Sequence, residues 1–405
     1  MKKTNADPVR EVLERGVSEV IVKKELETLI RSKKKIKLYL GIDPTGKELH
    51  LGHTIALRKL RQFQNLGHEV YFLVGSFTAL IGDTSDKNSM RPPMTPEQIE
   101  ENFKTYKAQA AKILDFSKTT IVYNGEWLSK LKLADILNLA NKFTVQQMIE
   151  RDMYQERLKQ GKPIGLHEFL YPLMQGYDSV ELNVDLEVGG NDQLFNMLAG
   201  RTLQKVLNSR DKHVMTMQLI EGTDGRKMAK TYGNVININD EPADMYGKIM
   251  SMSDRLIGRY FELCTDVPME EISAMEEEMM AGANPRDFKM RLGREIVAMY
   301  HGAKASGEAE ERFITVFRKH DVPDDIEEKI LSKGEWNIID VLVETKLAPS
   351  KSEARRLVTQ GGVKVDESGG GALKKVEEIE KMITIGDHLV LIQVGKRRFL
   401  SIRKK

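Results

Sequence analysis

The most constraining feature of the sequence is the passage from Tyr39 to His53, which reads YLGIDPTGKELHLGH. It continues a strand-like run over residues 35–43, and an amphipathic helix is expected to begin near His50. The start of a helix offers unpaired backbone N–H groups and the positive end of the helix dipole, which suit a phosphate. His50 and His53 share one helix face, and Gly52 lets a base or ribose approach the backbone. The passage therefore predicts a nucleotide-binding helix after a strand.

Two other readings of this passage stay open. The histidines could be ordinary exposed residues of a strand, a turn and a helix. A metal site is the weaker reading, because no third His, Cys or carboxylate stands at a suitable spacing.

A second pattern lies about 180 positions further on, where GTDGRKMAKT spans residues 222–231. It follows an apolar run and predicts a glycine-containing loop that carries Lys227 and Lys230. Two lysines three positions apart could neutralise a triphosphate. Taken alone, such a loop is more often a solvated turn.

Between these patterns, the segment 171–179 has a helical period. Tyr171, Gln175 and Asp178 then lie on one face and would line one wall of a site. The alternative is an exposed polar stripe.

Together the patterns resemble the class I aminoacyl-tRNA synthetases, whose HIGH and KMSKS motifs correspond to HLGH at 50–53 and KMAKT at 227–231. Ala229 and Thr231 depart from the commonest wording but leave both lysines in place. With GDTS at 82–85 and GGNDQ at 189–193, the chain resembles the bacterial-type tyrosyl-tRNA synthetases over nearly its whole length.

The resemblance implies a tyrosine site. Tyr39 and Asp178 would hydrogen-bond the phenol, and Tyr171, Gln175 and Asp83 would surround the α-ammonium group. Phenylalanine would leave both phenol partners unpaired, and this family is itself the standard example of such rejection. The set implied to bind tyrosine is Tyr39, Asp43, Asp83, Tyr171, Gln175, Asp178 and Gln193, with Gln193 near the substrate carboxylate. Tyr39 differs in some branches of the family, and Thr84 stands where many members have proline.

The same resemblance implies the chemistry. The tyrosine carboxylate attacks the α-phosphorus of ATP, and the tyrosyl group then passes to the terminal ribose of tRNA(Tyr). Catalysis would rest on positioning and on stabilising charge on the phosphates, with Mg²⁺ bridging phosphate oxygens and no metal ligand from the protein. The residues expected to position the phosphates and stabilise their charge are Thr45, His50, His53, Lys227, Lys230 and Thr231. Gly52, Asp192 and Lys230 are expected to bind ATP, with Asp192 on the ribose. The lysine loop is expected to close over ATP and open to release product.

The length of 405 residues predicts two or three domains. We expect an α/β fold with a Rossmann-like parallel-sheet catalytic domain over 1–238. A helical insertion at about 91–165 would form the interface of a homodimer. An α-helical anticodon-binding domain would follow over 239–325, and a small α+β S4 RNA-binding domain over 336–405.

Finer predictions concern the elements within these domains. A leading helix is expected from about Pro8 to Arg31. Strands are expected over 35–43 and 69–76, with residues 119–123 a possible third. Four helical segments are expected between Asn239 and about Asp321.

The last module resembles an S4 RNA-binding domain. Ser350 would cap a short helix that carries Lys351, Arg355 and Arg356 along one side, as phosphate contacts. A solvated charged face is the alternative. Residues 336–405 hold 14 Lys and Arg against 9 Asp and Glu, so the basic excess of the chain lies here.

The composition indicates in which cellular compartment the protein is expected. The single cysteine, Cys264, cannot form an internal disulfide and is expected to be buried. No apolar run is long enough to cross a bilayer or form a signal segment. We therefore expect a cytoplasmic protein without a membrane partner.

Two other functions remain open from the sequence. One is a tryptophanyl synthetase or another HxGH nucleotidyltransferase, which has no need of the phenol-reading pair Tyr39 and Asp178. The other is a non-catalytic RNA-binding protein that keeps the synthetase frame. Against it, the residues that carry the chemistry are intact.

Overall fold

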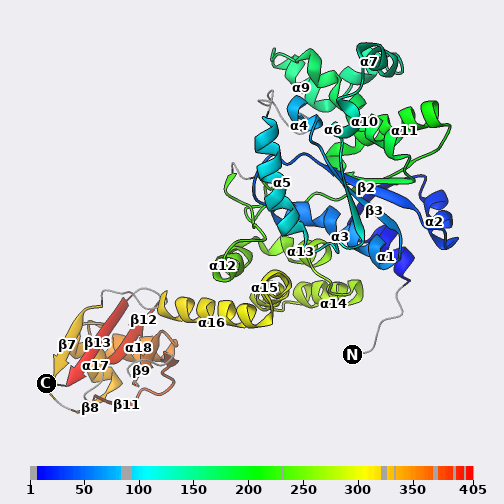
Figure 1. Ribbon diagram of the computed structural model, residues 1–405. Coiled ribbons are helices and arrows are strands. Elements are labelled where there is room, and N and C mark those ends of the chain that lie inside the picture. Colours follow the sequence, from blue (N-terminus) through cyan, green and yellow to red (C-terminus); the bar gives the residue numbers. More distant parts are fainter. Residues whose placement is uncertain are drawn as a thin grey trace. The chain divides into compact units, whose positions relative to one another are not determined.

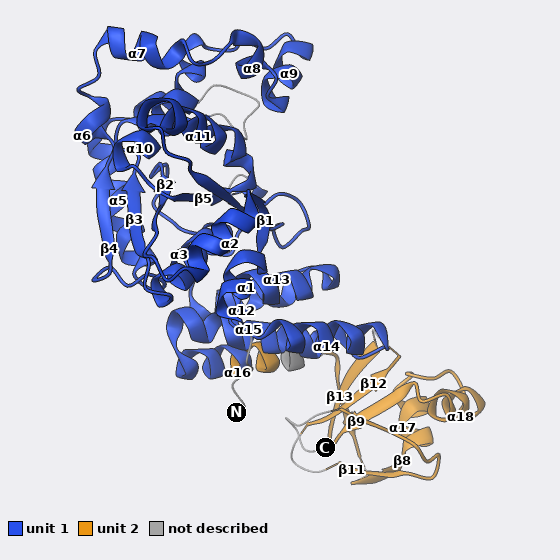
Figure 2. Cartoon of the chain, turned by 90° about the vertical axis from the view of Figure 1, so that its right-hand side faces the viewer, with its two compact units in different colours: residues 1–310 blue, residues 311–405 orange. Residues whose placement is uncertain are grey.

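The computed structural model describes residues 7–83, 94–229, 232–320, 326–332, 334–367, 373–385, 389–395 and 398–404, with helix backbone only for 316–320. The elements are labelled in Figure 1. The chain divides into two compact units, residues 1–310 and 311–405 (Figure 2). Thr84, Lys230 and Thr231 lie outside the described residues.

The first unit is built on a six-stranded sheet. Its strands are β1 (Val17–Ile21), β2 (Lys37–Ile42), β3 (Glu69–Val74), β4 (Thr119–Tyr123), β5 (Leu186–Gly190) and β6 (His213–Met217). The helices up to β6 are α1 (Pro8–Glu14), α2 (Lys23–Arg31), α3 (Leu51–Asn65), α4 (Thr78–Ile81), α5 (Pro96–Ala110), α6 (Gly125–Leu128), α7 (Leu133–Ala140), α8 (Val145–Ile149), α9 (Asp152–Lys159), η1 (Leu166–Phe169), α10 (Tyr171–Leu182), η2 (Asn191–Gln193) and α11 (Leu194–Asn208).

The strand order is β1-β6-β5-β2-β3-β4, and all neighbours are parallel except β1 with β6. Helix α3 connects β2 to β3, and α11 connects β5 to β6 in the opposite direction along the sheet. Because such crossovers are right-handed, α3 and α11 cover opposite faces, as Figure 1 shows. The order reverses between β2 and β5. Ligands of such sheets bind outside the carboxyl ends of the strands at this reversal.

The predicted strands 35–43, 69–76 and 119–123 are confirmed as β2, β3 and β4. The predicted single helix from Pro8 to Arg31 is wrong, because β1 divides it into α1 and α2. Gly16 has a φ of 65°, and Val22 lies in the left-handed region, so each end of β1 breaks a helical path. β1 then pairs with β6 at the edge of the sheet.

Between residues 239 and 320, the prediction of four helical segments is also wrong, since the described residues there form five α-helices and a 3-10 turn. They are α12 (Pro242–Ser251), η4 (Asp254–Leu256), α13 (Ile257–Cys264), α14 (Met269–Met280), α15 (Pro285–His301) and α16 (Ala303–His320). Gly302, with a φ of 87°, separates α15 from α16. Cys264 is buried in α13, as expected.

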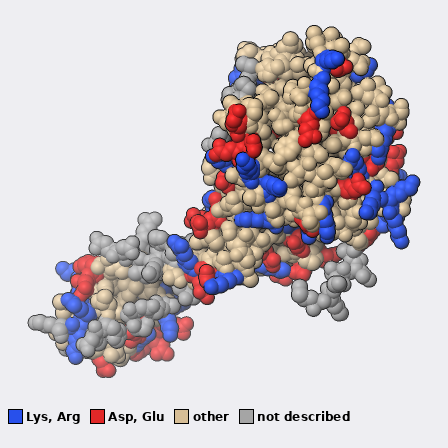
Figure 3. All heavy atoms as spheres, viewed as in Figure 1, with Lys and Arg blue, Asp and Glu red and all other residues tan. Residues whose placement is uncertain are grey.

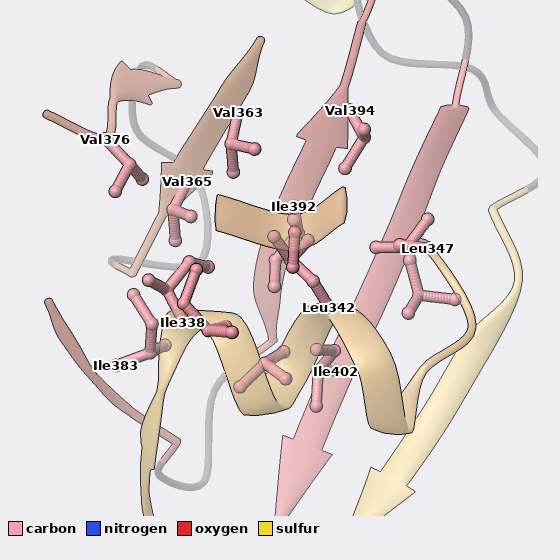
Figure 4. Close-up of a cluster of buried hydrophobic side chains, with 14 of the residues drawn as sticks. Ile338, Leu342, Leu347, Val363, Val365, Val376, Ile383, Ile392, Val394 and Ile402 are labelled. Carbon is pink, nitrogen blue, oxygen red and sulfur yellow. The ribbon is translucent and has the colours of Figure 1, made fainter. Parts of the chain in front are cut away.

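The second unit packs two helices against a five-stranded sheet. Its elements are β7 (Glu328–Leu331), β8 (Glu335–Asn337), α17 (Ile338–Glu344), α18 (Lys351–Thr359), β9 (Val363–Asp366), β10 (Lys374–Lys375), β11 (Met382–Thr384), β12 (Val390–Val394) and β13 (Arg398–Lys404). The sheet order is β10-β9-β12-β13-β7, and β8 pairs separately with β11. Figure 4 shows the core, in which Ile338 and Leu342 of α17 meet strand residues such as Ile392 and Ile402. β7 therefore belongs to this sheet, although it precedes residue 336, where the S4 domain was predicted to begin.

The surface carries both signs of charge. On the face shown in Figure 3, Lys and Arg side chains are interspersed with Asp and Glu. Among the described residues, no helix is both long enough and apolar enough to span a membrane.

Candidate active site

A cavity of about 210 Å³ opens where the sheet order reverses. It lies between the ends of β2 and β5, with α10 along one wall. Nine predicted site residues line it: Tyr39, Asp43, Thr45, His53, Asp83, Tyr171, Gln175, Asp178 and Gln193. The structure thus brings the predicted tyrosine-binding set into one place.

A second cavity of about 280 Å³ adjoins the first, because Ile42, His53 and Tyr106 line both. His50, Gly52, Asp192 and Lys227 line it as well. The first motif and the lysine loop therefore meet at one cavity.

Backbone hydrogen bonds hold the two motifs together. The N–H of Leu51 donates to the Ile236 carbonyl at 2.9 Å, and the N–H of Ile238 donates to the Leu49 carbonyl at 2.9 Å. His50 also forms a β-bridge with Asn237. The start of α3 is thus fixed against the chain that follows the lysine loop.

The two histidines lie together at the start of α3. The His50 backbone N–H donates to Nδ1 of His53 at 3.2 Å, and the ring centroids are 3.8 Å apart. With Nδ1 as an acceptor, the neutral His53 ring carries its proton on Nε2. A Cβ at Gly52 would lie 3.1 Å from the His50 ring, so glycine leaves this ring its place.

Asp178 lines the first cavity and is 1% exposed. Trp127 Nε1 donates to its Oδ1 at 2.8 Å, and Asn124 Nδ2 donates to its Oδ2 at 3.1 Å. Burial raises the pKa of the Asp178 carboxyl well above its usual value, while these two donors act to lower it. Neither donor was predicted, because both follow β4, far from any motif.

Tyr39 is fully buried beside Asp178. Its hydroxyl is 2.8 Å from Ser179 Oγ. Burial raises the pKa of the Tyr39 phenol well above its usual value, and the nearby Glu187 and Asp178 add to this. The hydroxyl therefore remains protonated. Ser179 and Glu187 were also absent from the predicted site.

Two further carboxylates, Asp43 and Asp83, line the same cavity. Asp43 accepts from the Tyr171 hydroxyl at 2.9 Å and from Thr78 Oγ1 at 2.7 Å. A Cβ at Gly75 would lie 1.9 Å from the Asp43 carboxylate, so only glycine fits there. Asp83 accepts from Gln193 Nε2 at 2.8 Å.

Asn234 organises the lysine loop. Its Oδ1 accepts from the Ala229 N–H at 2.9 Å, and its Nδ2 donates to the Lys227 carbonyl at 3.0 Å and to Asp224 at 2.8 Å. Bonds from Asn234 and from Arg226 hold the pKa of Asp224 at about 2. The side chain of Asn234 is buried, whereas Lys227 is exposed.

In the second unit, Ser350 caps α18 as predicted, accepting from the Glu353 N–H at 3.3 Å. Lys351 forms an ion pair with Asp340 at 2.7 Å, and Arg356 forms one with Glu353 at 2.6 Å. Arg355 has no ion pair among the described residues. The three basic side chains are exposed on one short helix.

Comparison with known proteins places this arrangement in a family. Residues 31–318 match the family of class I tRNA synthetases for tryptophan and tyrosine, and residues 319–402 match the C-terminal domain of the SYY type of tyrosine–tRNA ligase. The chain belongs to the class I tRNA synthetases of the tryptophan and tyrosine group.

Curated relatives are more specific. The chain is 48% identical over 393 residues to the tyrosine–tRNA ligase of Thermotoga maritima, covering 96% of each protein. It is 46% identical over 403 residues to that of Carboxydothermus hydrogenoformans, covering 97% of each. The predicted resemblance to bacterial-type tyrosyl-tRNA synthetases is confirmed.

Solved structures agree on the fold. The tyrosyl-tRNA synthetase of Archaeoglobus fulgidus, determined with L-tyrosine, superimposes with a TM-score of 0.62 at 24% identity, covering 75% of this chain and 98% of that one. The truncated mitochondrial enzyme of Aspergillus nidulans gives 0.64 at 23% identity, covering 77% and 95%. The predicted fold class is confirmed.

Proposed function

We propose that the chain is an ATP-dependent tyrosine–tRNA ligase that forms tyrosyl-adenylate and transfers tyrosine to tRNA(Tyr). The observation that carries this proposal is that Tyr39 and Asp178 both line the first cavity and are both buried. A phenol needs one donor and one acceptor when it leaves water. Tyr39 supplies a hydroxyl and Asp178 supplies a carboxylate already held by two donors.

Other residues of this cavity suit the α-ammonium group. Asp83, Gln175 and the hydroxyl oxygen of Tyr171 offer acceptors for it, and Asp43 lines the same cavity. A cation in a partly dry pocket is stabilised by carboxylates and neutral acceptors. The substrate carboxylate would then face Gln193 and the second cavity.

ATP would occupy the second cavity, with its phosphates near the start of α3. His53 can donate from Nε2 to a phosphate oxygen, and Lys227 supplies positive charge. Thr45, His50, Lys230 and Thr231 are assigned the same task, and Asp192 is assigned to the ribose. Gly52 gives the nucleotide access to the backbone.

The first step needs no protein nucleophile. The tyrosine carboxylate attacks the α-phosphorus, the bond to pyrophosphate breaks, and charge grows on the phosphate oxygens. Fixed donors and cations at those oxygens stabilise the transition state. In the second step, a ribose hydroxyl of tRNA attacks the adenylate carbonyl and releases AMP.

Mg²⁺ is assigned to ATP itself. Within the described part of the chain, no three His, Cys, Asp or Glu side chains are grouped so as to hold a metal ion. We propose that the ion would enter with the phosphates of ATP.

We propose a homodimer that forms through the helical segment between α6 and α10. Its large apolar side chains are unusually exposed for a monomer surface: Leu133 is 72%, Leu137 61%, Val145 71% and Leu166 80% exposed. Replacing Leu133 and Leu137 with Glu should shift the mass measured by light scattering from two chains to one. An unchanged mass would contradict this interface.

We propose that the protein works in the reducing cytoplasm, where ATP and tRNA are found. We also propose that the basic side chains of α18 contact tRNA phosphates. Replacing Arg355 with Ala should raise KM for tRNA about threefold and leave ATP–pyrophosphate exchange unchanged, because a phosphate contact is lost far from tyrosine. Changed exchange would contradict the assignment.

The experiment that tests the function is ATP–pyrophosphate exchange with each of the twenty amino acids, followed by charging of tRNA(Tyr). Tyrosine alone should support exchange. Exchange with tryptophan instead would identify the other member of the family. The absence of any exchange would favour a binding protein without activity.

A further inference from the structure

A buried ion pair lies directly behind the first cavity. Lys212 precedes β6 and is 0% exposed, and its ammonium contacts the carboxylate of Glu187 in the neighbouring strand β5. Glu187 lines the cavity. Taking both charges out of water costs more than their attraction generally returns, so such a pair is weak evidence for stability. The role of the pair therefore lies in its contacts with the pocket residues.

One set of contacts leads to the phenol end of the cavity. The Lys212 ammonium has only protons to donate, so Ser179 Oγ, at 2.8 Å, must accept. The single Ser179 proton then goes to Tyr39 at 2.8 Å or to Glu187 at 3.4 Å, and the shorter contact favours Tyr39. With Ser179 donating to it, Tyr39 has its own proton left to donate, and Glu187 is a nearby acceptor for that proton until a substrate phenol replaces it.

The other set leads to the ammonium end. An ionised Glu187 can only accept, so Gln175 must turn its NH₂ group toward it, at 3.1 Å. The Gln175 carbonyl oxygen then points the other way. It is buried and has no hydrogen-bond partner among the described residues, so it is an acceptor that remains to be satisfied.

Close helix packing makes room for this arrangement. A Cβ at Gly200 of α11 would lie 2.6 Å from Lys212 Nζ and 2.7 Å from Ser179 Oγ. A Cβ at Gly176 of α10 would lie 3.0 Å from the Gly200 backbone nitrogen. Two facing glycines thus allow the ammonium to reach between α10, α11 and the sheet.

We infer that Lys212, Glu187 and Ser179 set the direction of the hydrogen bonds at both ends of the tyrosine pocket. The inference rests on the proposed function and extends it. Through Ser179, the pair makes Tyr39 a donor to the substrate phenol, which in turn donates to Asp178. Through Glu187, it aims the Gln175 oxygen at the substrate ammonium. These are positioning residues, since Lys212 and Ser179 act on the substrate only through others.

A double-mutant cycle on Ser179 and Tyr39 tests the phenol end. Ser179→Ala should raise KM for tyrosine about tenfold with kcat little changed, since one hydrogen-bond direction is lost. In a Tyr39→Phe chain, the same substitution should change KM less than about twofold, because no hydroxyl is left to orient. Ser306→Ala, which removes another buried hydroxyl bonded to a backbone carbonyl, is the matched control and should leave KM unchanged.

A ligand pair separates orientation from packing. Tyramine and 2-phenylethylamine differ by the phenol oxygen alone. Ser179→Ala should weaken inhibition by tyramine and leave inhibition by 2-phenylethylamine unchanged. Equal losses for both, or additive losses in the double-mutant cycle, would overturn the inference while tyrosine-dependent exchange by the unaltered chain still upheld the proposed function. If the unaltered chain failed to exchange with tyrosine, both would fall.

Neutralising the pair tests both ends together. Lys212→Met with Glu187→Gln removes both charges at once, so neither is left unpaired, and the folded state should remain as stable as before. The amide that replaces the Glu187 carboxylate can donate or accept, so Gln175 loses its fixed orientation as Tyr39 does. KM for tyrosine should rise about 10- to 100-fold. A marked loss of thermal stability with an unchanged KM would show a structural pair and overturn the inference.

Discussion

The two adjoining cavities are built in different ways. In the first cavity, which we propose binds tyrosine, the side chains that would meet the substrate are themselves held by buried partners. Asn124 and Trp127 hold Asp178, and Ser179 holds Tyr39. In the second cavity, which we propose binds ATP, the cationic side chain of Lys227 is exposed and lies on a loop. The buried Asn234 holds the backbone of this loop rather than the Lys227 ammonium.

The difference separates recognition from catalysis. A site that must distinguish a phenol from a bare ring needs donors and acceptors that cannot reorient, and these need burial. A site that must bind a triphosphate and release pyrophosphate needs charge that can approach and withdraw. Changes in the first cavity should therefore act on KM for tyrosine, and changes in the second on the rate of adenylate formation.

The largest effect is expected from Asp178→Asn. It should lower kcat/KM for tyrosine about 10³-fold, because the phenol proton loses a charged acceptor. Stability should behave in the opposite way. A carboxyl whose pKa is raised in the folded state binds its proton more tightly there than in the unfolded chain, so its ionisation destabilises the fold above pH 3.8.

The thermal midpoint of Asp178→Asn at neutral pH should thus be equal to or higher than that of the unaltered chain. Calorimetry and exchange kinetics measure the two effects. A lower thermal midpoint together with lost activity would mean that the substitution damages the fold, and it would contradict the prediction that only recognition of the phenol is lost.

Lys227→Ala should come next. It should slow adenylate formation about 10²-fold, because charge on the departing pyrophosphate loses a cation, and leave the Kd for tyrosine unchanged. Stopped-flow and equilibrium binding separate the two quantities. Lys205→Ala, an exposed lysine paired with Asp211, is the control. Weaker tyrosine binding with an intact rate would remove the distinction between the cavities.

Asn234→Ala should have a smaller effect of the same kind. Three hydrogen bonds to the loop are lost, so Lys227 spends less time in place, and adenylate formation should slow about tenfold. KM for tyrosine should not move. Faster proteolysis near residue 225 would report the loosened loop. A rate equal to that of the unaltered chain would show that the loop is positioned without Asn234.

Asn124→Ala should give the smallest effect at neutral pH. Asn124 donates to Asp178 and lowers its pKa, so its loss should raise that pKa further. Because a protonated Asp178 cannot accept the phenol proton, the acid side of the kcat/KM profile for tyrosine should move to higher pH. Asn208→Ala, which removes an exposed side chain bonded to Val180, is the control. A profile that moved to lower pH would contradict the role given to Asn124.

Much of the frame and part of the site follow from local patterns. HLGH at the start of α3 could be found because a strand, a glycine and a helix start stand in order. Tyr171, Gln175 and Asp178 could be placed on one wall because helical spacing puts them there, and all three line the cavity. The strand β1 was missed, because five residues between two helical segments gave a weak signal.

The supporting groups could not be found in this way. Lys212 and Glu187 are 25 positions apart, and Tyr39 and Ser179 are 140 apart. A lysine before a strand is ordinarily exposed, and no spacing rule links it to a serine on a distant helix. The pairing of β5 with β6 brings Lys212 to Glu187, and the pairing of β2 with β5 brings Tyr39 beside Glu187.

The most direct test of the account is the ratio of kcat/KM for tyrosine to that for phenylalanine in ATP–pyrophosphate exchange, measured for the unaltered chain and for Asp178→Asn. We expect a strong preference for tyrosine that collapses in the variant, with similar kcat/KM for phenylalanine in both. A preference that survived the substitution would place the recognition of the phenol elsewhere and contradict the central claim.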